Sequence, residues 1–285
     1  MYTCLKLLFS CFFSCLLFAF TIRVKQVLNA KEIEKDFISI SNNLLVNKYE
    51  VSNGDYKKFL SYLKEANQEL YNQCIWDTAQ WEENIPLRTF YHAHRAYNNY
   101  PAVTISYDAA NAYCQWLTEQ YHLDINRKYK KVVFRLPTEQ EWIQAANGGN
   151  KNKMYPWGNY YLRNRKGEFL CNFLHLGDQS ITYDEKTKSY KVVSSFGEGV
   201  SMDSAFKSGL YDRALFHTSV QAFDPNEEGF YNLSGNAAEM VAEKGLAKGG
   251  SYNDPGYDVR ISSRKRYEHP SPEIGFRVAM EIIEK

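Results

Sequence analysis

No cysteine follows Cys171 in this chain, so the C-terminal loops cannot contain a disulfide or a thiolate metal site. Three of the six cysteines lie in the first thirty residues, and the remainder of the chain keeps only Cys74, Cys114 and Cys171. Three cysteines allow at most one internal disulfide, and we identify Cys74 and Cys171 as the pair to test. Cys114 falls within an apolar helical pattern and is expected to be buried as a small hydrophobic side chain.

The chain also has almost no net charge. Its 34 Lys and Arg residues balance 33 Asp and Glu residues, which gives a formal net charge of +1. This balance does not indicate that the chain binds nucleic acid or an acidic membrane surface. Linkers rich in Gly, Ser or Pro are absent, and no fixed period repeats. We therefore predict one domain from residue 38 to 285, which is long enough to bury a hydrophobic core.

The one long apolar run lies at the N-terminus, over residues 7–20. A run this short is typical of a signal peptide, although the basic residues just after it leave an uncleaved anchor as the alternative. Cleavage is predicted after Ala30, and Cys15 stands in a poor lipoprotein box. Residues 1–30 are therefore expected to be a signal peptide or N-terminal anchor. The protein is expected to be exported, to the periplasm or to the outer membrane and cell envelope.

N-cap residues predict three helices. Ser52 precedes an apolar face made by Tyr56, Phe59, Leu60 and Leu63, and Ser106 precedes a second helix. Thr138 and Glu141 form a capping box, and the helix that they start is expected to end near Gly148. Short strands are expected over residues 44–50, 132–136, 248–252 and 276–281. The long irregular stretches 71–104 and 160–228 need something to order them, and bound metal ions are one answer.

Seven segments in one order resemble the formylglycine-generating enzyme (sulfatase-modifying factor) domain family. They read YEVSNGDYKKFL, YPAVTISYDAANAYCQWL, FRLPTEQEWIQAANGG, YPWGN, GFYNLSGNAAEMV, KGGSY and GFRVA. The resemblance spans residues 45–281 and implies an α+β fold related to C-type lectins. Such a fold has little regular secondary structure, three short helices and small antiparallel sheets, and it is ordered partly by calcium.

The resemblance also implies two calcium sites built from oxygen ligands, which calcium prefers. The family's second site falls on Asn232, Gly235, Ala237 and Glu239, where the first and last give side-chain oxygens and the other two give backbone carbonyls. The first site maps to Asn172, Phe173, Asp212 and Ala214. Other motif residues are expected to be architectural: Arg135 with Glu141, and Trp142 and Trp157 in the core. Arg277 is expected to anchor the last strand through a buried ion pair.

The chain departs from the family where its chemistry is done. Active members carry a pair of cysteines after the GGSY segment, and here the two positions are Asp254 and Val259. Formylglycine formation uses copper held by two thiolates, whereas Asp is a hard oxygen ligand and Val is no ligand. We therefore predict no catalytic residues, calcium as the bound ion, and neither copper nor iron. The alternative metal position is His92 with His94, which would share a face if they lay on a strand.

The segment between residues 74 and 107 is similar to an insertion in gliding-motility lipoproteins of Bacteroidota. That branch keeps the scaffold, lacks the catalytic cysteines and works in an envelope secretion and motility machine. The first hypothesis is thus an exported, calcium-ordered, catalytically inactive domain that contacts subunits of an envelope complex. Its N-terminal segment would associate with the membrane. The alternatives are a family oxidoreductase of the formylglycine-generating or non-heme iron type that uses non-standard residues, and a lectin-like ligand-binding protein.

Overall fold

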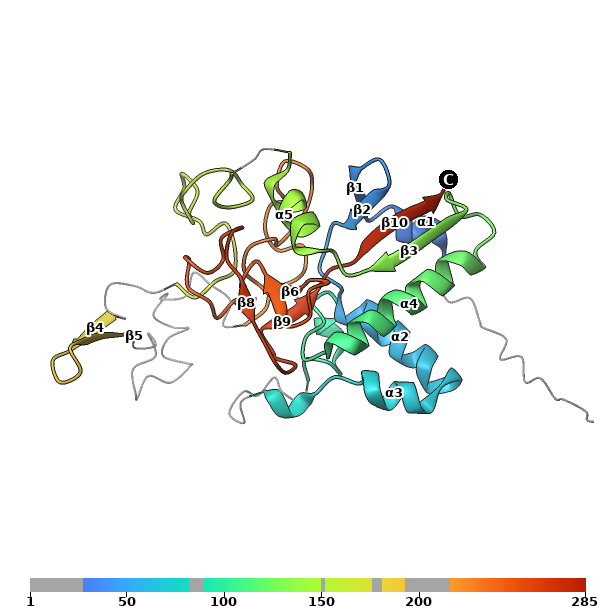
Figure 1. The fold of residues 1–285 in the computed structure, drawn as a ribbon. Helices are drawn as coiled ribbons and strands as arrows, with labels where there is room; N and C mark the ends of the chain where they lie inside the picture. The colour runs from blue at the N-terminus through green and yellow to red at the C-terminus, as the bar shows by residue number, and fades with distance from the viewer. Residues whose placement is uncertain (1–27, 82–89, 150–151, 176–180, 193–215) are drawn as a thin grey trace, which may run out of the picture.

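A computed structural model describes residues 28–81, 90–149, 152–175, 181–192 and 216–285 of the chain. Within these ranges, two four-stranded sheets and a two-stranded hairpin are joined by helices and long irregular segments. The hairpin pairs β4 (Ile181–Asp184) with β5 (Ser189–Val192). Figure 1 shows the helices α2 and α4 gathered at one end of the body and the second sheet near its middle. The predicted α+β class is confirmed.

The first sheet contains strands from both the N-terminal and the C-terminal parts of the domain. Its strand order is β1 (Phe37–Ser41), β2 (Leu44–Asn47), β10 (Ala279–Glu284) and β3 (Lys131–Arg135). Every pairing is antiparallel, and Met280 of β10 lies opposite both Leu45 of β2 and Phe134 of β3. The C-terminal strand is therefore a central strand of this sheet.

The three predicted helices begin where their caps place them. They are α2 (Asn53–Ala66), α4 (Tyr107–Leu123) and α5 (Glu139–Asn147). The side chains of Ser52, Ser106 and Thr138 each accept the backbone N–H three residues on, and Gly148 ends α5 with a left-handed conformation. Two short α-helices were not predicted, α1 (Ala30–Glu34) and α3 (Gln68–Cys74), and short 3-10 turns occupy Thr78–Gln80 and Arg95–Tyr97.

The second sheet corrects two strand predictions. Its order is β8 (Lys265–Arg266), β7 (Leu246–Lys248), β6 (Ala238–Met240) and β9 (Ile274–Phe276), with β6 and β9 parallel. The strand expected over 248–252 ends at Lys248 because Gly249 and Gly250 turn the chain with positive φ values of 84° and 65°. The strand expected over 276–281 divides into β9 and β10, which belong to different sheets.

Aromatic side chains fill the core between the helices and the sheets. Phe59 of α2 contacts Tyr113 and Trp116 of α4 with ring centroids 5.6 and 5.4 Å apart. Phe276 of β9 meets the edge of Tyr113 at 5.5 Å. Each of these rings is at least nine-tenths buried, so the packing joins α2, α4 and the second sheet in one core.

Packing begins before residue 38. Ala30 of α1 is fully buried, and its N–H donates to Oδ2 of Asp124 at 2.8 Å. Asn29 caps the same helix through its side chain. Cleavage after Ala30, which stays a prediction, would remove both residues and the contacts that they make.

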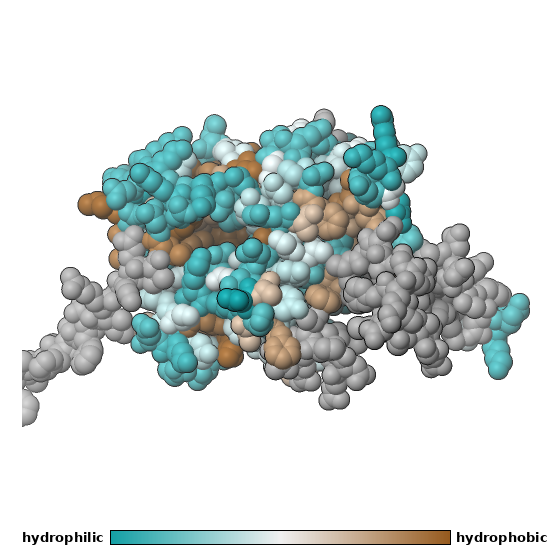
Figure 2. Space-filling model, turned by 180° about the vertical axis from the view of Figure 1, so that it is seen from behind, coloured by the Kyte–Doolittle hydropathy of each residue, from teal (hydrophilic) through white to brown (hydrophobic). Residues whose placement is uncertain are grey.

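None of the helices in the described ranges is long and apolar enough to cross a membrane. The apolar run of residues 7–20 lies outside those ranges. Figure 2 shows one face of the molecule, on which hydrophilic residues cover most of the surface and hydrophobic residues are visible between them.

Helix α4 covers the outer edge of the first sheet. Strand β3 lies at that edge. The N–H of Val132 donates to Nε2 of His122 at 3.2 Å, and the N–H of Phe134 donates to Oγ1 of Thr118 at 2.9 Å. Side chains of α4 thus occupy the edge N–H groups of this strand.

Candidate functional site: two buried carboxylates and a closed loop

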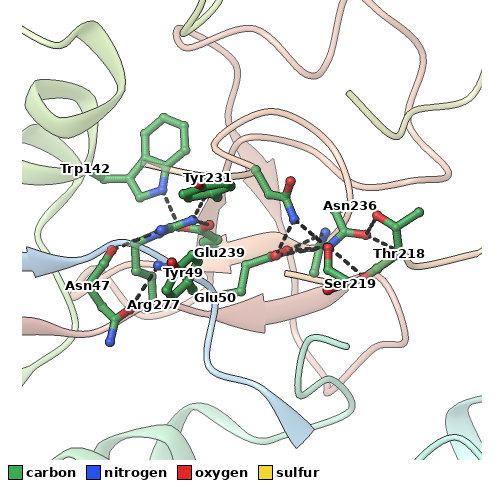
Figure 3. A network of polar contacts seen from close by, with 12 residues as sticks. Asn47, Tyr49, Glu50, Trp142, Thr218, Ser219, Tyr231, Asn236, Glu239 and Arg277 are labelled. Carbon is green, nitrogen blue, oxygen red and sulfur yellow. Dashed lines mark hydrogen bonds and ion pairs between the residues drawn. The ribbon is translucent and has the colours of Figure 1, made fainter. Parts of the chain in front are cut away.

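A buried ion pair joins the two sheets. Glu239 of β6 and Arg277, between β9 and β10, are 1% and 0% exposed. The guanidinium donates to both carboxylate oxygens, at 2.5 and 2.9 Å, and Nε1 of Trp142 donates to the same carboxylate at 2.7 Å. Arg277 also donates to the backbone carbonyls of Asn47 and Tyr231 (Figure 3). The predicted role of Arg277 as an anchor of the last strand is therefore seen directly.

A second buried carboxylate, Glu50, lies beside this pair without a cation of its own among the described residues. It accepts hydrogen bonds from the side chains of Asn232 and Asn236 at 3.0 Å and from the N–H of Ala237 at 3.2 Å. Burial, followed by the charge of Glu239, raises the pKa of Glu50 to about 8. Sequence reasoning missed this residue, although it stands in the motif YEVSNG.

The fold brings the residues of the predicted second calcium site into one turn. The φ values of Asn232 and Gly235 are both positive, 51° and 72°. Oδ1 of Asn232 is buried and has no hydrogen-bond partner in the described part of the chain, which suits a hard cation. Glu239 fits less well, because Arg277 and Trp142 already occupy its carboxylate. Ala237 is buried in the same turn.

The first predicted calcium site is described only in part. Asn172 is 1% exposed, and its Oδ1 also lacks a partner within the described residues, while its Nδ2 donates to the carbonyl of Phe216 at 2.8 Å. Phe173 is buried next to it. Asp212 and Ala214 lie outside the described residues. The part that is described therefore offers one orphaned hard oxygen, which is the type of ligand that calcium prefers.

An ion pair closes the loop where the family carries its cysteines. The carboxylate of Asp254 accepts bonds from the N–H and Oγ of Ser251 at 2.8 and 2.7 Å and from Nζ of Lys265 at 2.6 and 2.7 Å. Lys265 pairs with Glu273 as well. Val259 is fully buried. These residues do not fit copper, because one position is an engaged carboxylate and the other is an apolar side chain.

His92 and His94 do not share a face. They lie in a turn, so the strand that would have paired them is not formed. His92 is buried, with Nδ1 3.1 Å from Oδ1 of Asn53 and Nε2 3.0 Å from Oγ1 of Thr104. His94 is exposed, and its Nδ1 accepts the N–H of Ala96. Among the residues that the structure describes, no group of three or more His, Cys, Asp or Glu side chains is placed to hold a metal ion.

The cysteines correct the predicted disulfide. Cys74, Cys114 and Cys171 are all free and buried. Cys74 and Cys114 belong to the core around α2 and α4, whereas Cys171 packs with Tyr155 and Val259 under the closed loop. Burial raises the pKa of each of these thiols, which keeps them protonated and unreactive.

One of the expected architectural residues, Trp157, differs from the prediction. Arg135 makes two hydrogen bonds to Glu141, at 2.7 and 2.8 Å, as expected of an internal polar contact. Trp142 is fully buried in the core. Trp157 is only partly buried: it stacks on Tyr155, but it also lines a groove at the surface.

Two buried histidines predict that the fold is sensitive to acid. Burial lowers the pKa of His92 and of His217 to about 3, and the nearby carbonyl of Pro272 opposes the shift of His217 only in part. The unfolded chain takes up protons on both residues below about pH 6.5, whereas the folded chain does not. The contribution of these two residues is therefore present above that pH and is lost as the pH falls, by about 2 kcal/mol per histidine at about pH 5, whereas protonation of Glu50, whose pKa is raised to about 8, opposes part of the loss. Urea unfolding at about pH 7 and about pH 5 measures this loss.

A His217→Phe variant separates this effect from general acid sensitivity. The ring lies among Trp81, Tyr91 and Tyr252, so phenylalanine suits the site. On acidification the variant is expected to lose about 2 kcal/mol less stability than the parent chain, because the opposing contribution of Glu50 is the same in both proteins. A His94→Phe variant changes an exposed histidine and should behave like the parent. An equal loss in all three proteins would contradict the assignment.

Comparison with known proteins finds a matching family and several relatives. Residues 25–282 match the family described as the sulfatase-modifying factor enzyme 1-like domain. The formylglycine-generating enzyme of Mus musculus is 26% identical over 225 residues, which are 68% of this chain and 47% of that protein. The inactive C-alpha-formylglycine-generating enzyme 2 of Bos taurus is 29% identical over 196 residues, which are 63% and 50% of the two chains.

The solved structure of CarF has the same fold. Its TM-score is 0.53 at 19% sequence identity, and the superposition covers 84% of this chain and 86% of that one. This chain spans about half the length of the curated relatives named above.

Proposed function

Because this chain belongs to the sulfatase-modifying factor enzyme 1-like domain family, we propose that it is a calcium-ordered member without catalytic activity. It is exported and serves as a structural or binding component of a bacterial cell-envelope complex for secretion or gliding motility. The observation that carries the absence of catalysis is the closed loop, in which Lys265 neutralises Asp254 and Val259 is buried.

The chemistry of the loop supports this proposal. Copper-dependent oxidation of a substrate cysteine needs two soft thiolate ligands. At the first of the two cysteine positions, the ammonium group of Lys265 supplies the positive charge that a metal ion would otherwise bring. Both carboxylate oxygens of Asp254 accept hydrogen bonds there, so neither is free for a soft ion. At the second position Val259 packs among Tyr155, Cys171 and Phe173. The name of the Bos taurus relative, which calls that protein inactive, agrees with this reading.

An oxidation assay tests the absence of catalysis. The purified chain is incubated with copper, oxygen and a peptide that contains cysteine, and formylglycine is followed by mass spectrometry. We expect no conversion, while the Mus musculus enzyme converts the same peptide under the same conditions. Conversion by this chain that depends on copper would overturn the proposal.

The location and the partners are supported by the sequence. The apolar leader supports export, and the segment between residues 74 and 107 supports the likeness to motility proteins. A pull-down from native envelope membranes with the tagged full chain should recover subunits of the secretion or motility machine. Recovery of the chain in the cytoplasmic fraction, with no envelope protein attached, would contradict this part.

The calcium proposal predicts a change in stability on chelation. A ligand that binds only the folded state stabilises it by about 2.7 kcal/mol when its free concentration is a hundred times its Kd. Chelation should therefore lower the Tm of the parent chain, and Asn172→Ala should reduce that response, because the variant lacks the orphaned ligand oxygen of the first site and keeps that of Asn232 in the second. Asn72→Ala, on the exposed side of α3, should respond like the parent. A Tm that is unchanged by chelation in the parent would remove calcium from the proposal.

A further inference from the structure

A surface groove of about 590 Å³ runs between residues 157–170 and residues 222–225. This volume lies in the range of small-molecule binding sites. Aromatic rings and carboxylates alternate along it: Trp157, Phe169 and Phe223 supply the rings, and Glu168 and Asp224 supply the carboxylates.

Trp157 forms a rigid flat wall of the groove. Its ring stacks on Tyr155 with centroids 5.0 Å apart and only 7° between the planes. Its Nε1 donates to the carbonyl of Tyr161 at 2.9 Å. Both contacts fix the orientation of the indole before any ligand arrives, which lowers the entropy cost of binding.

Trp157 packs against the apolar cluster that lies beneath the loop containing Asp254 and Val259. Trp157 and Phe169 pack against Tyr155, Phe173 and Val259. The valine at the position of the second family cysteine therefore supports the groove from below. Val259, which stands where the family has its second cysteine, and Trp157, which forms the wall, therefore pack in the same apolar cluster.

A smaller cavity beside the groove contains a buried acceptor without a partner among the described residues. A cavity of about 20 Å³ shares Trp157, Phe223 and Asp224 with the groove and is also lined by Asn232. Asn232 is 7% exposed, and its Nδ2 donates to Glu50 and to Ser219, whereas its Oδ1 has no partner in the part of the chain described. This volume holds one group of about the size of a water molecule. This oxygen is the one that the proposed second calcium site would use, so ligand binding in the groove does not depend on it.

We propose that this groove binds a neutral oligosaccharide. A sugar ring lays its C–H face on Trp157, and its hydroxyl groups donate to Asp224 and Glu168. The lining is rich in acceptors and offers Lys166 as its one charged donor. It therefore suits hydroxyl donors better than the carbonyls of a peptide, and its two carboxylates disfavour an anionic sugar. The inference specifies a ligand for the proposed binding role and does not depend on the absence of catalysis.

Isothermal titration calorimetry of the full chain with neutral hexose and N-acetylhexosamine oligosaccharides tests the proposal. We expect saturable binding to at least one of these compounds. Asp224→Ala and Trp157→Ala should each weaken it by about tenfold, which corresponds to the loss of one hydrogen bond or one stacking contact. Asp224 is exposed, so its variant keeps the fold even if Trp157→Ala does not.

Tyr160→Ala is the matched control, because this tyrosine is 74% exposed and does not line the groove. Its affinity should equal that of the parent chain. Absence of binding to every neutral oligosaccharide, equal binding by the Asp224 variant, or preference for an acidic sugar or a peptide would each overturn the proposal. None of these results depends on cysteine oxidation. The proposal of oligosaccharide binding can therefore be contradicted while the proposal that the chain lacks catalytic activity stands, and the reverse also holds.

Discussion

Replacing Arg277 with alanine is expected to lower the free energy of unfolding by about 3–5 kcal/mol, the cost of leaving a buried charge unpaired. The variant leaves the carboxylate of Glu239 in the core with Trp142 as its remaining donor. The backbone carbonyls of Asn47 and Tyr231 lose their donor as well. Urea denaturation, followed by circular dichroism, measures the change.

Arg264→Ala is the control for the loss of a two-pronged arginine contact. Arg264 also bonds both oxygens of a glutamate, Glu139, but its side chain is 57% exposed. An exposed pair contributes about 0–1 kcal/mol, so this variant should change stability little. The double variant Arg277→Ala/Glu239→Gln should be less unstable than Arg277→Ala, because it removes the stranded charge. Similar small losses in both single variants would show that the buried pair does not hold the sheets together.

Replacing Gly235 with alanine is expected to cost about 3 kcal/mol or more, because steric overlap adds to backbone strain. A Cβ at this position would lie 2.0 Å from the carbonyl oxygen of Asn172, and the φ value of 72° is unfavourable for any L side chain. The neighbouring N–H of Asn236 donates to the same oxygen, so the segment cannot move away without losing that bond. The midpoint and slope of urea unfolding give the measurement.

Gly167→Ala isolates the backbone part of that cost. Its φ value is 86°, yet nothing lies within 4 Å of the added Cβ. It should lose only about 1 kcal/mol, the price of a left-handed conformation for alanine. If the two glycine variants lost equal stability, the close approach of Gly235 to Asn172 would be wrong.

The helices could be predicted because their signals are local. Ser52, Ser106 and Thr138 each lie within three residues of the N–H that they cap, so a short window of sequence contains both partners. Gly148 ends α5 for a similar reason, since glycine accepts the left-handed conformation without a steric cost. The motif order led to the family for the same reason, because each motif is a short local pattern.

Contacts between distant residues could not be predicted in this way. The hydrogen bond from Trp142 to Glu239 joins residues 97 positions apart in the sequence, and the hydrogen bond from Asn232 to Glu50 joins residues 182 positions apart. The partner of Asp254 was missed because nothing in the sequence around Lys265 marks it as the cation of that loop. The proposed disulfide failed because the positions of the cysteines in the sequence carry no information about which core cluster receives each one.

The occupied edge of β3 limits how this protein can associate with others. An exposed edge strand can add a strand from another chain, through its free N–H and C=O groups. Here Thr118 and His122 of α4 already accept N–H groups on that side. A neighbouring chain would have to displace a helix to extend the sheet at this edge. Assembly at the β3 edge should therefore use side-chain surfaces, and this edge should resist strand-to-strand aggregation.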